Sequence, residues 1–267
     1  MASLYEEAFI DSVGGRLFVR SWVPQHDARA ALVAVHGFNS HGGYYERFAV
    51  HLAARGIAVH ALDLRGHGNS AARRSGVRQF SQYHEDIDAL MRSDRVHQPL
   101  LPLFMMGHGA GGVAASLYAL TRQRDLAGLI CESIALDLPV SATLFGCVRA
   151  LALIAPRLPV QRQPARTVAA LIRAGSRLKS SLAQLSLPLL ILHGSADTVT
   201  LPSGSEHAHE RSASPDKTLQ IFEGYHHDLI NGQGHEQVME RILQWIGDRL
   251  NAEHRNQIGI AYINADT

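Results

Sequence analysis

A glycine-rich turn in the middle of the chain has the layout of a turn that presents a nucleophile. The apolar run Leu103–Met106 leads into Gly107-His108-Gly109-Ala110-Gly111-Gly112, and the helix-like stretch Val113–Leu120 follows. A strand, a sharp turn and a helix in this order are the context of the Gly-x-Ser-x-Gly motif, in which the central serine is the nucleophile. The central residue here is Gly109, which has no side chain that could attack a substrate.

The same turn also fits a second motif. Gly107, Gly109 and Gly112 spell Gly-x-Gly-x-x-Gly between a strand and a helix, and Glu132 follows twenty residues after Gly112. This is the outline of a dinucleotide-binding fingerprint, in which backbone N–H groups at the start of a helix hold a pyrophosphate. The local string does not distinguish a dinucleotide site from a nucleophile turn, so the rest of the chain has to decide.

Strand-like and helix-like segments alternate along most of the chain. This alternation predicts an α/β fold, in which a mostly parallel central sheet carries helices on both faces. An N-terminal hairpin is expected around Gly14-Gly15. Further strands are expected at 30–35, 57–62, 101–106, 126–131, 189–192 and 218–222, and helices at 44–55, 80–91 and 236–250.

The alternation breaks between Ile134 and Leu187, where no strand is evident and prolines interrupt short helical stretches. Within this segment, Leu144–Ile154 is apolar on nearly every side, as expected of a helix that covers an apolar pocket. We therefore divide the chain into the N-terminal part of the core (1–133), a short helical lid (134–186), the C-terminal part of the core (187–250) and a loose tail (251–267).

The composition is that of a globular protein without a strong charge preference. Of the 267 residues, 46% are hydrophobic and 18% are charged, and the net charge is +1. We therefore expect no nucleic-acid partner and no integral membrane span. Two cysteines and a start without a signal-like apolar stretch indicate a cytoplasmic protein with reduced thiols. The sixteen histidines are scattered, so we expect no metal site, and the oligomeric state stays open.

Residues that could carry chemistry gather where the predicted strands end. Because ligands of a parallel sheet bind beyond the carboxyl ends of its strands, segments at these ends are expected to form one site. The segments are His36-Gly37-Phe38, Asp63–Gly68, Gly107–Gly112, His193–Asp197 and Tyr225–Asp228.

In this order, the segments resemble the α/β-hydrolase family, specifically its monoacylglycerol lipase and lysophospholipase branch, of the serine aminopeptidase S33 type. The branch's His-Gly-x-x-x-His-x-x-x-Tyr is matched at 36–45, and its Asp-x-x-Gly-His-Gly-x-Ser at 63–70. His193-Gly194-Ser195-Ala196-Asp197 resembles the acid motif, and His227-Asp228-Leu229-Ile230-Asn231 resembles the histidine motif. A dinucleotide-binding protein would have no reason to carry these four motifs.

The resemblance implies an α/β-hydrolase fold and carboxylic-ester hydrolysis without a metal or organic cofactor. Gly109, Asp197 and His227 occupy the positions of nucleophile, acid and base, in the chain order typical of the fold. Asp197 is expected to orient His227, and the backbone N–H groups of Phe38 and Ala110 to form the oxyanion hole. The implied partner is a small apolar ester or an acyl-type ligand.

The remaining polar residues of these motifs are expected to support the site. We interpret His226 as a packed neighbour of the base, and His36 and His41 as structural supports of their loop. Arg65 and His67 are expected to orient loops in the same way.

Two departures from the family pattern stand out. The segment between Arg162 and Ala169 looks shortened, which predicts a smaller lid, and Gly109 leaves no activated oxygen for an acyl-enzyme. Three interpretations of Gly109 stay open. In the first, an engineered or natural replacement of serine has abolished or impaired serine hydrolysis. In the second, the His227–Asp197 pair acts as a general base in a lyase-type or cyclase-type reaction. In the third interpretation, the protein binds a ligand and catalyses no reaction.

Overall fold

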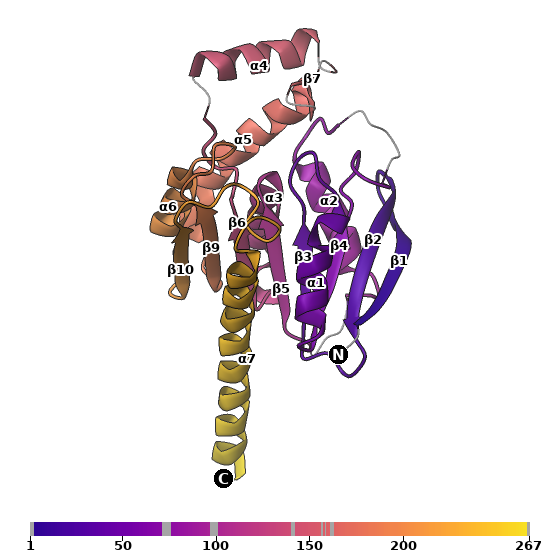
Figure 1. The fold of residues 1–267 in the computed structure, drawn as a ribbon, viewed down its shortest axis with the longest axis vertical. Helices are drawn as coiled ribbons and strands as arrows, with labels where there is room; N and C mark the ends of the chain where they lie inside the picture. The colour runs from indigo at the N-terminus through magenta and orange to yellow at the C-terminus, as the bar shows by residue number, and fades with distance from the viewer. Residues whose placement is uncertain are drawn as a thin grey trace.

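A computed structural model describes residues 3–70, 76–96, 101–139, 142–155, 157, 159–160 and 163–265. Its main element is an eight-stranded sheet in the order β1-β2-β4-β3-β5-β6-β9-β10 (Figure 1). Antiparallel pairing joins β1 to β2 and β2 to β4, and the remaining neighbours pair in parallel. The predicted hairpin and the mostly parallel sheet are therefore confirmed. The strands are β1 Ser3–Ser12, β2 Gly15–Pro24, β3 Ala30–Val35, β4 Ile57–Leu62, β5 Leu103–His108, β6 Gly128–Glu132, β9 Leu189–Gly194 and β10 Lys217–Phe222.

The central strands are buried on both faces. Every residue of β3 and β4 is buried, and the side chains of β3 alternate between two cores, with Leu32 and Ala34 in one and Val33 and Val35 in the other. Successive side chains of a strand point to opposite faces, so a doubly covered strand appears as a continuous apolar run. This is why the sequence located the bounds of β3 and β4 correctly.

Helices cover both faces of the sheet (Figure 1). Residues of α1 (Glu46–Ala53) and α7 (His235–Ala265) belong to one core cluster. The second core cluster contains residues of four further helices. These four are α2 Ser81–Met91, α3 Ala110–Arg122, α5 Ala165–Ser181 and α6 Pro202–Arg211.

The segment predicted as a lid lies beyond the carboxyl ends of the strands, with α4 (Ala142–Ile154) outermost and α5 between it and the sheet (Figure 1). The expectation that this segment contains no strand is wrong, because β7 (Pro159–Val160) pairs antiparallel with β8 (Gln163–Pro164). Two-residue strands are too short to leave a periodic signal in the sequence. At the end of α4, Leu153 is 85% exposed.

The last helix is longer than expected. The sequence predicted a helix that ends at Leu250, followed by a loose tail, whereas α7 continues to Ala265. The apolar periodicity that marks a packed helix stops near residue 250, so the pattern did not extend the helix further. Within the described ranges, no helix has the length and apolar character needed to cross a membrane.

Candidate functional site

The turn between β5 and α3 has a backbone shape that only a few residue types tolerate. Gly109 has φ 54° and ψ −117°, and its carbonyl oxygen accepts a 3.1 Å hydrogen bond from Gly112. Its own N–H group donates to the carbonyl oxygen of Glu132 at 3.0 Å. A positive φ costs an L residue free energy, and such conformations concentrate at functional sites. Glycine adopts this conformation without that cost, so only a side chain placed at position 109 would be strained.

The three glycines of the turn differ in the space around them. A Cβ atom on Gly107 would overlap the carbonyl oxygen of Gly111, and one on Gly111 would overlap that of Val35. A Cβ atom on Gly109 would instead meet His227 Nε2 first, at 3.4 Å, which is ordinary van der Waals contact. The two flanking glycines are thus required by close backbone packing, whereas position 109 has room for a side chain directed at His227.

His227 and Asp197 form a hydrogen-bonded pair next to this turn. His227 Nδ1 lies 2.8 Å from Asp197 Oδ2, and because a carboxylate only accepts, the Nδ1–H group is the donor. The other carboxylate oxygen accepts from the backbone N–H groups of Val199 at 2.7 Å and Thr200 at 3.0 Å. This arrangement leaves Nε2 of His227 as the free ring nitrogen, on the side of Gly109.

A second histidine, to which the sequence reasoning assigned no role, also contacts the acid. His193 is fully buried, with its Nε2 3.1 Å from Asp197 Oδ2 and its Nδ1 2.6 Å from Ser205 Oγ. Burial alone would raise the pKa of Asp197, but the hydrogen bonds from His193 and His227 hold this pKa well below its usual range. Asp197 is therefore an ionised carboxylate that several donors orient. In the sequence, the only indication of this contact was that His193 precedes Asp197 by four residues within the same motif.

Glu132 anchors the loop that carries His227. It is completely buried, and its Oε1 accepts hydrogen bonds from the backbone N–H groups of Leu229 at 2.9 Å and Ile230 at 3.1 Å. Burial, followed by the charge of Asp228, raises the pKa of Glu132 to about 8. The dinucleotide interpretation counted this residue as part of its fingerprint, but the carboxyl group faces the loop of His227 inside the protein.

Two further contacts restrain the His227 segment. Ser133 Oγ donates to the carbonyl oxygen of His227 at 2.8 Å. The ring of His108 lies 4.5 Å from that of His227 and stacks on Tyr44 at 4.9 Å. Burial, together with the charge of His227, lowers the pKa of His108 to about 3, so this ring is neutral at physiological pH.

The positions expected to form an oxyanion hole lie in the same cavity. Phe38 and Ala110 line a cavity of about 270 Å³ together with Gly109 and His227. Ala110 is the first residue of α3, where backbone N–H groups have no partner within the helix. Four of the five predicted site residues therefore lie around one cavity, and the fifth, Asp197, contacts it through its hydrogen bond to His227.

The supporting residues of the motifs make structural contacts. His36 donates from Nδ1 to the carbonyl oxygen of Gly37 at 2.7 Å and accepts at Nε2 from the N–H of Leu64 at 3.0 Å, which fixes its tautomer. Arg65 pairs with the buried carboxylate of Asp86.

Two more of the supporting histidines lie at loops. His41 Nδ1 accepts from the N–H of Gly43 at 3.1 Å, which caps a helical turn. His67 packs edge-on against the ring of His36. His226 is not the packed neighbour we expected, because it is exposed and its Nδ1 lies 3.0 Å from the carbonyl oxygen of Ala196.

Nothing in the described part of the chain resembles a metal centre, since no three histidine, cysteine or acidic side chains gather there closely enough to hold an ion. The geometry is that of a hydrogen-bonded carboxylate–imidazole pair and a positive-φ glycine turn beside a small cavity.

Comparisons with known proteins identify the family of the chain and its relatives. The family model Hydrolase_4, described as serine aminopeptidase, S33, matches residues 26–166 and 155–234. The chain is 28% identical over 273 residues to a monoacylglycerol lipase of Mycolicibacterium smegmatis, covering 92% of this chain and 98% of that protein. It is 30% identical over 271 residues to the monoglyceride lipase of Homo sapiens, covering 90% of this chain and 89% of that protein. A solved structure of a soluble variant of the Saccharomyces cerevisiae monoglyceride lipase has a TM-score of 0.83 at 21% identity, covering 93% of this chain and 97% of that one.

Proposed function

This chain belongs to the serine aminopeptidase S33 family of α/β-hydrolases, and we propose that its site derives from a monoacylglycerol-type or lysophospholipid-type ester hydrolase whose nucleophilic serine is replaced by Gly109. One observation carries the proposal. Position 109 has the positive-φ backbone of a nucleophile turn, and a Cβ atom there would lie 3.4 Å from Nε2 of His227. A glycine selected only for tight packing, such as Gly111, has no such room.

The remaining groups have defined roles in ester hydrolysis. A serine hydroxyl at position 109 would transfer its proton to His227 Nε2 while it attacks the ester carbonyl. Asp197 would stabilise the resulting imidazolium, and the N–H groups of Phe38 and Ala110 would bind the developing oxyanion. Gly109 supplies no oxygen, so the chain as it stands forms no acyl-enzyme and serine hydrolysis is lost or severely impaired.

The lining of the cavity supports a small uncharged acyl ligand. The residues that line it in the described part of the chain include Leu138, Val168, Leu171 and Val199, and none of them is an acid, a lysine or an arginine. Its volume of about 270 Å³ lies near the lower end for pockets that take small molecules. A short acyl chain bound through its ester carbonyl fits these walls. The charged head group of a lysophospholipid-type ester would stay outside them, because no acid, lysine or arginine lines the cavity in the described part of the chain.

A second candidate function rests on the intact state of the acid and base. Asp197 still receives donors from His193, His227 and the Val199–Thr200 backbone, so the pair needs no serine to stay ordered. In this reading, His227 acts as a general base on water or on the bound substrate itself. It predicts an activity of the unmodified protein that His227→Ala abolishes. A ligand-binding homologue, by contrast, keeps its affinity in that variant.

The decisive experiment restores the nucleophile. Gly109→Ser is expected to hydrolyse p-nitrophenyl butyrate and a monoacylglycerol at least 10³-fold faster than the parent, because loss of a triad nucleophile leaves only residual acceleration. Gly109→Ala is the matched control, since it introduces the same Cβ and the same backbone strain without an oxygen. Adding His227→Ala to Gly109→Ser must remove the gain. A folded Gly109→Ser protein that is as inactive as Gly109→Ala would refute the proposed descent.

A further inference from the structure

The segment between Asp137 and Asp197 contains basic residues but no acidic ones. From 138 to 196 the sequence has seven basic residues and not one aspartate or glutamate, although the whole chain has 25 basic and 24 acidic residues. The excess of positive charge is therefore concentrated in and around α4 and α5. The seven residues are Arg149, Arg157, Arg162, Arg166, Arg173, Arg177 and Lys179.

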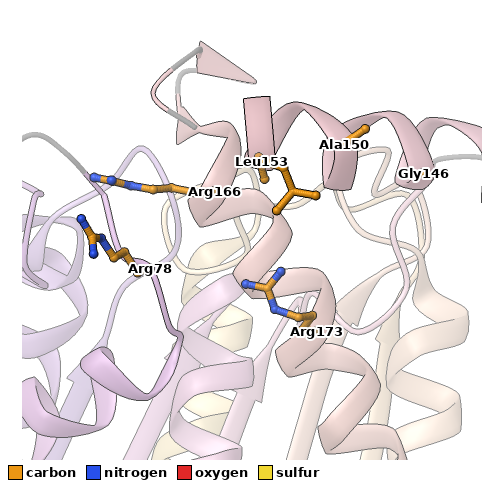
Figure 2. Close-up of a pocket in the computed structure, with 7 residues that line it drawn as sticks. Arg78, Gly146, Ala150, Leu153, Arg166 and Arg173 are labelled. Atoms are coloured by element: carbon orange, nitrogen blue, oxygen red, sulfur yellow. The ribbon is translucent and has the colours of Figure 1, made fainter. Parts of the chain in front are cut away.

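Part of this charge lines a cleft of about 710 Å³, which we call the arginine cleft (Figure 2). Arg166 and Arg173 come from α5 and Arg78 from the segment before α2, while the opposite wall is made by α4. Burial and the neighbouring charges of Arg78 and Arg157 lower the pKa of Arg166, which reflects positive groups held close together. Such a group of cations favours an anion among them. The cleft is lined by Arg78, Gly146, Ala150, Ala152, Leu153, Arg166 and Arg173.

The second wall of the arginine cleft is aliphatic and exposed. Figure 2 shows Leu153 on α4 above Arg173 and level with Arg166, and this leucine is 85% exposed. The next residue, Ile154, is 82% exposed. Two adjacent large aliphatic side chains left in water lose free energy unless an apolar group covers them. The cleft therefore combines an anion-binding side with an apolar side.

The arginine cleft is separate from the catalytic cavity. Arg166 and Arg173 are seven residues apart and lie on one side of α5, because seven residues make nearly two helical turns. Val168 and Leu171 lie on the other side of the same helix and line the catalytic cavity. The two lining sets share no residue.

We propose that the arginine cleft binds a single-chain anionic amphiphile. Its phosphate or carboxylate head lies among the guanidinium groups of Arg78, Arg166 and Arg173, and its alkyl chain lies along Ala150 and Leu153. The lining residues include no aromatic side chain that could stack on a base, and the aliphatic wall suits an alkyl chain better than a nucleotide. The proposal does not depend on the chemistry at Gly109.

Isothermal titration calorimetry with monododecyl phosphate, kept below its micelle concentration, tests the head-group side. Arg78→Gln and Arg173→Gln are each expected to weaken binding about tenfold, because each removes a charge-assisted contact. Both residues are exposed, so these variants should keep the parent's melting temperature. Arg29→Gln is the matched control: it removes the same charge from an exposed residue before β3, at the opposite end of the sheet. Equal affinity in Arg173→Gln and Arg29→Gln would overturn the proposal.

A second set of measurements tests the apolar side. Leu153→Asn, which adds no charge beside the bound anion, should weaken binding of monododecyl phosphate about tenfold. Val13→Asn, at a position that is 86% exposed in the N-terminal hairpin, should leave it unchanged. Inorganic phosphate should bind at least 100-fold more weakly than monododecyl phosphate, and neutral dodecyl maltoside should not compete with it. If inorganic phosphate binds as tightly, or if the maltoside competes, the amphiphile is not the ligand and the proposal is wrong.

Discussion

The buried carboxyl group of Glu132 makes a specific prediction about how stability depends on pH. Burial raises its pKa from 4.5 to about 8 in the folded protein. Between these two pH values the folded state keeps a proton that the unfolded state has released, so the free energy of unfolding falls as the pH rises. A difference of one pKa unit corresponds to about 1.4 kcal/mol, so the free energy of unfolding should fall by up to about 5 kcal/mol between pH 4.5 and 8.

Glu132→Gln removes this titration and keeps a carbonyl oxygen for the N–H groups of Leu229 and Ile230. We therefore expect the variant's unfolding free energy to fall less steeply with pH than the parent's. Urea unfolding followed by circular dichroism at pH 5, 6, 7 and 8 measures both slopes. Glu223→Gln, at an exposed position, is the control and should keep the parent's slope. If Glu132→Gln and the parent have equal slopes, Glu132 does not hold a proton as this reasoning requires.

Three further outcomes follow from the packing. Gly111→Ala should destabilise the fold by about 3 kcal/mol or more, because its Cβ would overlap backbone atoms, whereas Gly247→Ala in α7 should stabilise it by about 0.5–1 kcal/mol; thermal melting compares the two. Arg65→Met should cost about 3–5 kcal/mol in chemical denaturation, since it leaves the buried carboxylate of Asp86 without its cation. Asp197→Asn removes the carboxylate whose pKa is lowered in the folded protein. The stability that this carboxylate adds above pH 3.8, and that the parent loses on acidification, should therefore be missing from the variant's acid-unfolding curve.

Much of the fold could be predicted because local patterns and tertiary packing agree. The apolar runs at 30–35 and 57–62 are strands that neighbours cover on both faces, so their whole length is hydrophobic. The β5–α3 turn could be recognised from its glycines, because the close backbone packing at Gly107 and Gly111 leaves no room for any side chain. Short or solvent-exposed elements leave no such trace. The β7–β8 pair and the end of α7 were therefore predicted wrongly.

The sequence by itself predicted the alternation of strands and helices in the core and the positions of the motifs, because these follow from residue types at fixed spacings. The assignment of Asp197 and His227 as acid and base followed from the resemblance of those motifs to a known family. Tertiary structure alone decided which residues meet across long separations. It places His193 on Asp197 and the buried Glu132 under the loop that carries His227. It also shows that the space at Gly109 opens toward His227 Nε2, a direction that depends on φ 54° and on a loop more than a hundred residues away. Contacts of this kind are set by the packing of the sheet, and no local pattern encodes them.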